Sequence, residues 1–193
     1  MPQVISHAQG SPEWLQHRAS HFNASDAPAM LGISPYKTRA ELVREYATGI
    51  RPEPTPEQQR IFDRGHRIEA LARPLAEEII GEELAPLVLA DGKYSASFAG
   101  LTIGMDVAWE CKTFNAALRE AIPMRIDGIP ENGHQLPEHY RAQLEHQAMV
   151  SGCERILFTA ARDLDDETID EGRHCWYTPD PTMRARLVAG YQH

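Results

Sequence analysis

The sequence contains little of several features that mark particular classes of protein. It has three cysteines, Cys111, Cys153 and Cys175, none of them in a C-x-x-C spacing, so neither a disulfide framework nor a zinc or iron–sulfur site is expected. No apolar run is long enough to cross a bilayer, and the N-terminal stretch MPQVISHAQG has no apolar core typical of a signal peptide. We therefore expect a cytoplasmic protein without a membrane anchor.

Basic residues are also scarce. The chain has 19 Lys and Arg residues against 28 Asp and Glu residues, which gives a formal net charge of −9 at pH 7. This balance excludes a protein that coats nucleic acid through general basicity, although local basic residues can still contact nucleic acid. The length of 193 residues and a hydrophobic content of 42%, without low-complexity runs, predict one domain over residues 1–193.

Helix-start signals and two-residue periodicity alternate along the chain. Proline after serine or threonine, and capping-box patterns, indicate where helices begin. Helices are predicted from Ser11-Pro12 to Arg18, from Ser25-Asp26 to Gly32, from Thr38 to Gly49, from Thr55-Pro56 to Gly81, from Pro137, and over residues 181–189. Strands are predicted over residues 84–89, 94–102, 107–112, 156–160 and 175–177. Helices that flank a mixed sheet indicate an α/β or α+β fold.

The longest predicted helix carries a regular apolar stripe. Its members are Ile61, Gly65, Ile68, Ala72, Leu75 and Ile79. This spacing predicts one amphipathic helix that continues to Gly81, with a kink at Pro74.

A predicted β-hairpin leads to the sequence ECK at residues 110–112. Gly104-Met105 suits a type II′ turn, and a turn centred there places Ala99 opposite Glu110 with their Cβ atoms roughly 5 Å apart. Two carboxylates at these positions could share one metal ion at about 2.1 Å from each oxygen. Asp106 lies on the same face but roughly 13 Å along the strand, too far to bind the same ion. A metal ion shared across this hairpin would therefore need an acidic residue at position 99, where the sequence has alanine.

Four segments in order along the chain add to this pattern. They are RASHFNASDAPAMLGISPYKTRAEL, RGHRIEALARPL, SASFAG followed nine residues later by ECK, and LPEHYRAQLEHQAMVSG. Together they resemble the lambda exonuclease (YqaJ-type) viral recombinases of the PD-(D/E)xK nuclease superfamily, from residue 11 to about residue 160. The resemblance implies a restriction-endonuclease-like α/β core, with a mixed central sheet flanked by helices. Without it, Glu110-x-Lys112 would most simply be a solvated strand face.

The resemblance also implies an activity, a cofactor and partners. Similar enzymes are Mg²⁺-dependent, ATP-independent exonucleases that resect the 5′ strand of double-stranded DNA from 5′-phosphorylated ends. Oxygen ligands favour Mg²⁺, with Mn²⁺ as a substitute. These enzymes work as homotrimeric rings beside a single-strand annealing protein. A phage or prophage protein of a bacterial host is therefore expected.

Matched position by position, the resemblance assigns roles to residues of the hairpin and of two helices. Glu110 and the backbone carbonyl of Cys111 would bind the metal, and Lys112 would position or deprotonate the attacking water. Glu69 would hold a second metal ion or its water, and Gln143, in the pattern P-x-x-Y-x-x-Q, would orient the water. Two simpler interpretations stay open, namely a surface ion pair for Glu69 and an ordinary polar helix position for Gln143.

The N-terminal segment would bind the DNA end. The resemblance implies that Arg18, Ser25 and Ser97 form a pocket for the 5′-phosphate. Lys37 and Arg39, in the turn SPYKTR, are further candidates for contact with the incoming duplex. A helix that begins at Ser25-Asp26 would direct free backbone N–H groups toward an anion. The alternatives are a helix cap for Ser25 and a solvated charge for Arg18.

Position 99 departs from the family pattern, in which the residue before the glycine of SFAG is aspartate. We therefore expect a chain that binds DNA but hydrolyses it poorly, with Ala99 either an engineered substitution or a natural loss. Three other functions stay open. They are a DNA-binding ring or adaptor without nuclease activity, a structure-specific PD-(D/E)xK endonuclease, and a metal-free globular domain of unrelated function.

Overall fold

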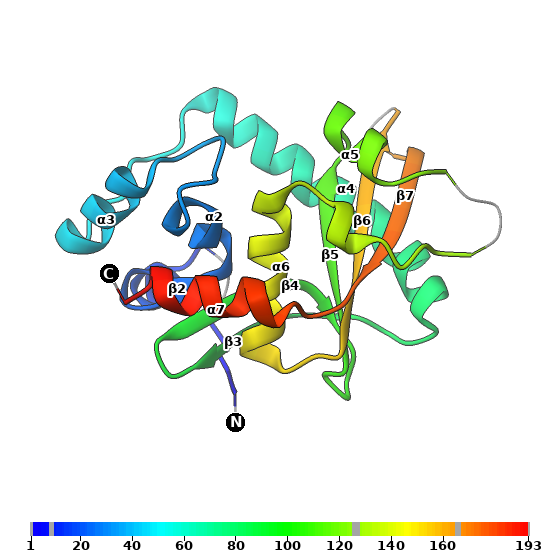
Figure 1. Cartoon of the computed structure of the whole chain (residues 1–193). Helices are drawn as coiled ribbons and strands as arrows, with labels where there is room; N and C mark the ends of the chain where they lie inside the picture. Colours follow the sequence, from blue (N-terminus) through cyan, green and yellow to red (C-terminus); the bar gives the residue numbers. More distant parts are fainter. Residues whose placement is uncertain (1, 8–9, 125–127, 165–166, 193) are drawn as a thin grey trace.

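A mixed β-sheet forms the centre of the structure, a computed structural model that describes residues 2–7, 10–124, 128–164 and 167–192 (Figure 1). The strands are β1 Gln3–Val4, β2 Phe22–Asn23, β3 Ala85–Asp91, β4 Tyr94–Leu101, β5 Val107–Thr113, β6 Arg155–Asp163 and β7 Ile169–Tyr177. The helices are α1 Pro12–Ser20, α2 Ala27–Met30, α3 Arg39–Thr48, α4 Pro56–Ile80, α5 Ala116–Ala121, α6 Glu138–Ser151 and α7 Pro181–Gly190, with 3₁₀ turns η1 Ala24–Asp26 and η2 Gly133–Gln135. The strands follow the order β1-β3-β4-β5-β6-β7 with β2 beside β4, and the pairs β5–β6 and β2–β4 are parallel. β1, β2 and α5 have no counterpart among the predicted elements.

The predicted capping patterns set the starts of two helices that flank the site. A capping box opens α3 (Thr38 with Glu41), and another opens α4 (Thr55 with Gln58). Both helices end at a glycine in the left-handed conformation, as the sequence predicts. Among the described residues, none of the helices is both long and apolar enough to cross a membrane.

Helices cover both faces of the sheet. α6 lies against β4 on one face, and α4 crosses β5, β6 and β7 on the other (Figure 1). Alternate residues of the central strands divide between two cores, with Ala108 and Phe158 on the α6 side and Trp109 and Leu157 on the α4 side. The arrangement confirms a mixed central sheet flanked by helices.

The apolar stripe of α4 is buried only where the helix covers the sheet. Ile68 and Ala72 are at most 1% exposed, whereas Ile61 is 61% exposed. Leu75 is 39% exposed, and the adjacent Ala76 is buried in its place. The first half of α4 extends beyond the strands toward α3 (Figure 1), so helical periodicity alone overestimates the length of the buried face.

Two ion pairs between arginines of α4 and the buried carboxylate of Asp163 anchor this helix at the end of β6. Oδ1 of Asp163 lies 2.6 Å from Nη2 of Arg64, and Oδ2 lies 2.9 Å from Nη2 of Arg67. The hydrogen bonds from Arg64 and then Arg67 lower the pKa of Asp163 to about 2, against the opposing effect of burial. Because Glu69 follows Arg67 on the same helix, this contact fixes the segment that faces the site.

The β4–β5 hairpin has the predicted register. Gly100 pairs with Trp109 and Leu101 pairs with Ala108, as predicted, but the pairs end there and do not include Ala99 and Glu110. A register shift between β3 and β4 lies at the same point, between Ala85 and Leu87 on β3. Such a β-bulge redirects side chains and is common beside binding sites.

The turn of this hairpin differs from the predicted type II′ turn at Gly104-Met105. The N–H of Met105 donates to the carbonyl of Thr102 at 2.9 Å, so Ile103 and Gly104 are the central residues of the turn. Met105 has a positive φ of 59°, whereas a type II′ turn centred at Gly104-Met105 requires it of Gly104. Thr102 and Val107 still close the loop through a backbone hydrogen bond of 3.0 Å, and the register is therefore unchanged.

Candidate functional site

A pocket of about 170 Å³ opens beside the bulge of β4. Residues from both flanking helices, from the central strands and from the N-terminal segment line it. They are Arg18, Asn23, Ala24, Ser25, His66, Glu69, Pro86, Ser97, Phe98, Ala99, Glu110 and Gln143. All predicted site positions except Arg39, Cys111 and Lys112 are among them, although they come from distant parts of the chain.

Glu110 is held from several sides. It is 6% exposed, and both of its carboxylate oxygens have partners. Oε1 lies 2.6 Å from Nζ of Lys112 and accepts a hydrogen bond from Nε2 of Gln143 at 3.1 Å. Oε2 accepts a hydrogen bond from Nε2 of Gln147 at 2.6 Å. These contacts satisfy a carboxylate whose burial would otherwise be costly.

Lys112 is charged in this arrangement. Burial alone would lower the pKa of its ammonium group, but the Glu110 carboxylate and the hydrogen bond to it outweigh burial and raise the pKa. Its side chain is 28% exposed. Lys112 therefore offsets the charge of Glu110.

Glu69 lies at the pocket and also forms the ion pair of the simpler alternative. It lines the pocket, and its carboxylate also forms an ion pair with Arg73, with 3.3 Å between Oε1 and Nη2. Burial, and then the charge of Glu110, raise the pKa of Glu69, while Arg73 opposes them. Two carboxylates thus share one pocket and repel each other.

Ala99 has no side-chain oxygen that could bind a metal ion together with Glu69 and Glu110. Ala99 is 8% exposed and belongs to the apolar core that contains Ile68 and Trp109. Within the described ranges, no three His, Cys, Asp or Glu side chains stand ready to hold a metal ion. The oxygen donors of Glu69 and Glu110 nevertheless fit a hard divalent cation, which would relieve their repulsion. Glu69 and Glu110 are therefore the two carboxylates among the residues that line the pocket.

Arg18 offers an unpaired positive charge at the same pocket. Its Nη2 donates to Oγ of Ser25 at 3.1 Å, and its guanidinium lies 4.8 Å from the centre of the Trp14 ring. Burial lowers the pKa of Arg18, although the neighbouring Asp26 opposes this. Among the described residues Arg18 forms no ion pair with a carboxylate. A half-buried cation beside the hydroxyls of Ser25 and Ser97 favours an anion.

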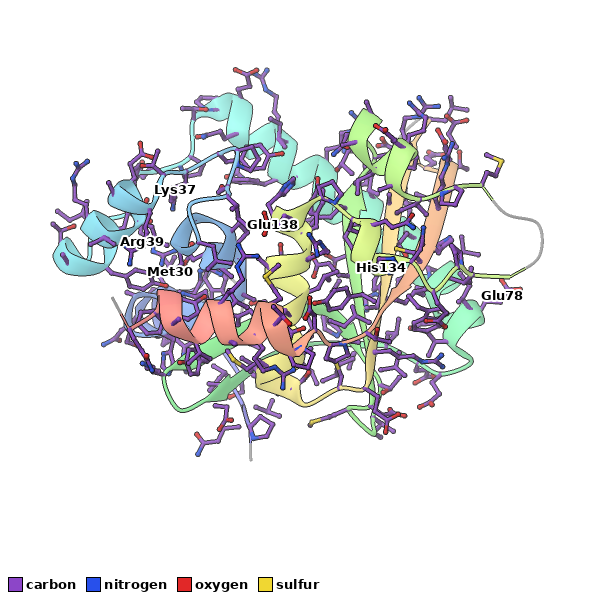
Figure 2. The ribbon with its side chains drawn as sticks, in the orientation of Figure 1. Met30, Lys37, Arg39, Glu78, His134 and Glu138 are labelled. Atoms are coloured by element: carbon purple, nitrogen blue, oxygen red, sulfur yellow. The ribbon has the colours of Figure 1, made fainter. Side chains whose placement is uncertain are left out.

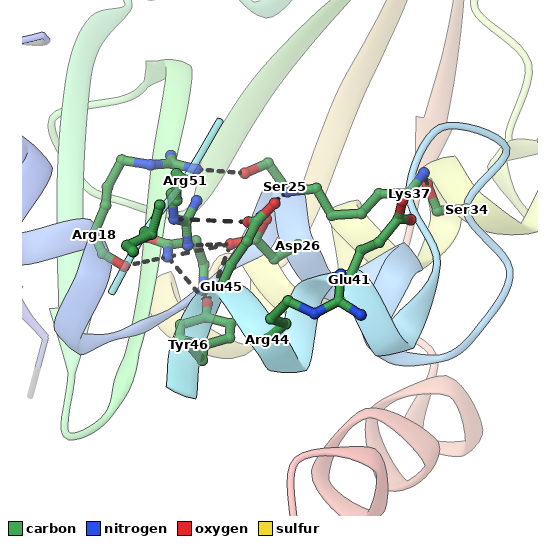
Figure 3. A network of polar contacts seen from close by, with 12 residues as sticks. Arg18, Ser25, Asp26, Ser34, Lys37, Glu41, Arg44, Glu45, Tyr46 and Arg51 are labelled. Atoms are coloured by element: carbon green, nitrogen blue, oxygen red, sulfur yellow. Dashed lines mark hydrogen bonds and ion pairs between the residues drawn. The ribbon is translucent and has the colours of Figure 1, made fainter. Parts of the chain in front are cut away.

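Asp26 pairs with other side chains of the network shown in Figure 3. Its Oδ2 lies 3.0 Å from Nη2 of Arg51 and accepts a hydrogen bond from the Tyr46 hydroxyl at 3.1 Å. The predicted helix start at Ser25-Asp26 needs correction. Ser25 lies inside the 3₁₀ turn η1, and α2, which follows Asp26, is only four residues long. The local backbone is bound into tight turns, so the Ser25 hydroxyl, not a long helix dipole, is the group offered to an anion.

Arg39 and Cys111 lie outside the pocket. Arg39 lies beside Met30 (Figure 2), donates from Nε to the Met30 carbonyl at 3.1 Å, and reaches the Gly190 carbonyl at 3.4 Å. It therefore joins α3 to α2 and to the end of α7. Cys111 pairs with Thr159 in the β5–β6 ladder, and burial raises the pKa of its thiol to about 12. Its backbone carbonyl remains a predicted ligand.

Gln147 and His66 are among the residues at the site that were not predicted. Gln147 contacts Glu110, and His66 lines the pocket. Each lies about one helical turn from a predicted residue, Gln147 after Gln143 and His66 before Glu69. That spacing was a usable signal, because residues three or four apart share one face of a helix.

Comparison with known proteins identifies the fold and the family. No curated protein matches the chain in sequence. In structure it is similar to the alkaline exonuclease LHK-Exo from Laribacter hongkongensis (18% identity, TM-score 0.64, 94% of this chain and 91% of that one) and to LHK-Exo in complex with dAMP (19%, 0.65, 93% and 88%). It is also similar to a phage related exonuclease from Haemophilus somnus 129PT (12%, TM-score 0.59, 89% and 90%). At these identities the likeness shows the fold, which is that of the PD-(D/E)xK nucleases. The YqaJ-like viral recombinase domain matches residues 13–154, and the chain therefore belongs to the YqaJ-like viral recombinase family.

Proposed function

We propose that this chain binds 5′-phosphorylated ends of double-stranded DNA, as a hydrolysis-impaired member of a family of 5′-to-3′ exonucleases. The observation that carries the proposal is the shared pocket, which brings Arg18, Ser25 and Ser97 together with Glu110 and Gln143. A terminal phosphate on Arg18 would bring the adjoining phosphodiester bond close to Glu110, because the pocket measures only about 170 Å³. An anion-binding group and a carboxylate in so small a space suit a DNA end better than a continuous duplex.

Mg²⁺ is the proposed cation, with Mn²⁺ as a substitute, held by Glu110, the Cys111 carbonyl and Glu69. When bound, it would neutralise phosphate charge and lower the pKa of a coordinated water. Lys112 would offset the charge of the phosphate, and Gln143 would orient the water. Because Ala99 contributes no carboxylate, we expect the ion to be weakly held and hydrolysis to be slow.

A DNA-binding adaptor is the second candidate, and Ala99 is the observation that favours it. Such an adaptor would hydrolyse nothing even with the carboxylate restored. A structure-specific endonuclease would instead cut circular DNA, whereas an exonuclease requires an end. Incubation of circular and linear duplexes with the carboxylate-restored protein separates these possibilities.

We also propose a homotrimer that acts with a single-strand annealing protein in phage-type recombination. The family resemblance supports this assembly, and an acidic outer surface around local basic residues agrees with the net charge of −9. Size-exclusion chromatography with light scattering measures the mass directly. A stable monomer at micromolar concentration would count against the trimer.

Arg18→Ala is expected to weaken binding of 5′-phosphorylated duplex about ten- to a hundredfold, while binding of 5′-hydroxyl duplex changes little. A charge-assisted hydrogen bond contributes about 1.5–3 kcal/mol, which corresponds to a loss of this size. Fluorescence anisotropy with blunt duplexes that differ only in the terminal group measures both affinities.

Arg39→Ala is the matched control for this variant. It removes the same charge outside the pocket, from a guanidinium that binds backbone carbonyls. The ratio of affinities for phosphate and hydroxyl ends should therefore stay as in the unmodified chain. If Arg18→Ala lowers both affinities equally, Arg18 does not bind the terminal phosphate.

A further inference from the structure

We propose that Gln147 positions the Glu110 carboxylate by bridging two strands that separate at the pocket. The inference rests on the proposed function, because it makes Gln147 responsible for presenting Glu110 to a divalent cation. Gln147 is 0% exposed and is not among the residues that line the pocket. It is therefore a positioning residue and not a catalytic one.

The side-chain amide of Gln147 binds to both strands. Its Nε2 donates to Oε2 of Glu110 at 2.6 Å and to the backbone carbonyl of Ser97 at 3.0 Å. Glu110 belongs to β5 and Ser97 to β4. A single nitrogen thus joins the strand that carries the acid to the strand that carries a phosphate-binding hydroxyl.

The described backbone pairing does not supply this connection. The pairs between β4 and β5 reach only as far as Gly100. Ser97 pairs with a residue of β3, and Glu110 pairs with a residue of β6. At the bulge β4 therefore pairs with β3 and β5 pairs with β6. The Gln147 side chain, from α6, connects β4 to β5 there.

The orientation of the Gln147 amide is fixed. A reversed amide would place its Oε1 against Oε2 of Glu110 at 2.6 Å, and both atoms are acceptors. In the observed orientation Oε1 is buried and has no hydrogen-bond partner among the described residues. A buried unsatisfied acceptor is unfavourable, and methionine would fill similar space without it. A glutamine at this position is therefore explained by its hydrogen bond to Glu110 and not by packing in the core.

Gln143 and Gln147 each bind one carboxylate oxygen of Glu110. They lie four residues apart on one face of α6, and Gln143 binds Oε1 while Gln147 binds Oε2. Gln143 lines the pocket, so solvent or substrate can replace its contact. Gln147 is enclosed and keeps its contact. Without it, Glu110 would lose its link to β4 and could rotate away from the pocket.

The test compares Gln147→Met with the unmodified residue, both in the chain as it stands and together with Ala99→Asp. Mn²⁺ affinity is measured by electron paramagnetic resonance without DNA, and melting temperature is measured in parallel. We expect Gln147→Met to weaken Mn²⁺ binding about ten- to a hundredfold, as is typical when a partner of a metal ligand is lost. Gln147→Leu serves as a second variant if the methionine variant fails to fold.

His146→Asn is the matched control. His146 is its neighbour on α6, is also 0% exposed, and contacts Tyr191 instead of the site. It should lower the melting temperature and leave Mn²⁺ affinity unchanged, which separates positioning from general stability. A folded Gln147→Met protein that binds Mn²⁺ within twofold of its parent overturns the inference alone. Absence of Mn²⁺ binding in Ala99→Asp with Gln147 intact rejects the proposed metal site, and this inference with it.

Discussion

We expect Ala99→Asp to give a protein that degrades linear, 5′-phosphorylated duplex DNA in the presence of Mg²⁺. The β4–β5 pairs end one residue before position 99, and Ala99 and Glu110 line the same pocket. A carboxylate there would complete the ligand set of Glu110 and Glu69. Loss of a partner of a metal ligand already costs about ten- to a hundredfold in affinity or activity, and a missing ligand should cost at least as much. Release of nucleotides from an end-labelled duplex measures the gain.

Lys112→Ala in the Ala99→Asp protein provides the complementary test. Lys112 lies 2.6 Å from Glu110 and carries the charge that a phosphate would meet. We expect its removal to abolish the restored hydrolysis while the protein still folds. If Ala99→Asp folds, binds DNA and releases no nucleotides, the adaptor function replaces the exonuclease.

The thermal stability of Ala99→Asp, with and without Mg²⁺, is an independent test of the proposed metal site. Position 99 is 8% exposed beside apolar residues, so an unpaired aspartate there is disfavoured. The variant should therefore melt below the unmodified chain without metal, and recover when Mg²⁺ binds. Binding to the folded state alone contributes about 2.7 kcal/mol at a ligand concentration a hundred times Kd.

The free energy of unfolding should fall as the pH is lowered from about 6.5 to about 4, and His146 should account for much of the change. Burial lowers the pKa of His146 to about 4, from an ordinary value of 6.5. Between these values the unfolded chain takes up a proton that the folded chain does not, so stability is present above pH 6.5 and is lost toward pH 4. One group contributes about 1.4 kcal/mol per pH unit, or on the order of 3 kcal/mol in all.

His146→Asn removes the titrating group and keeps an amide near Nδ1, which lies 2.8 Å from the Tyr191 hydroxyl. In chemical denaturation between pH 4 and pH 7, the free energy of unfolding of this variant should change less with pH than that of the unmodified chain. His174, whose pKa burial also lowers to about 4, contributes a similar slope and remains in both proteins. Identical slopes for the two proteins would mean that His146 does not titrate in this window.

Local signals predicted most of the larger helices and strands. Capping boxes located the starts of α3 and α4, and the hairpin register was correct although the turn at Gly104-Met105 was not. Register depends on the pairing of Thr102 with Val107, whereas turn type depends on individual dihedral angles. The family resemblance supplied the residues from distant segments that the pocket brings together.

Long-range packing explains what the sequence could not predict. β1 and β2 contain only two residues each and exist because β3 and β4 offer them partners. Helical spacing places Gln147 on the same face as Gln143, but its contacts with Ser97 and Glu110 depend on where β4 and β5 separate. Arg39 likewise lies against the Met30 carbonyl, and no local pattern shows that contact.

The most direct test is the affinity of the unmodified chain for two blunt duplexes that differ only in a 5′-phosphate or a 5′-hydroxyl, titrated with and without Mg²⁺. We expect tighter binding of the phosphorylated end by roughly ten- to a hundredfold, because Arg18 contributes one charge-assisted contact. We also expect little release of nucleotides, because position 99 has no carboxylate. Equal affinity for the two ends, or no binding of either, would contradict the assignment of this pocket to a DNA end.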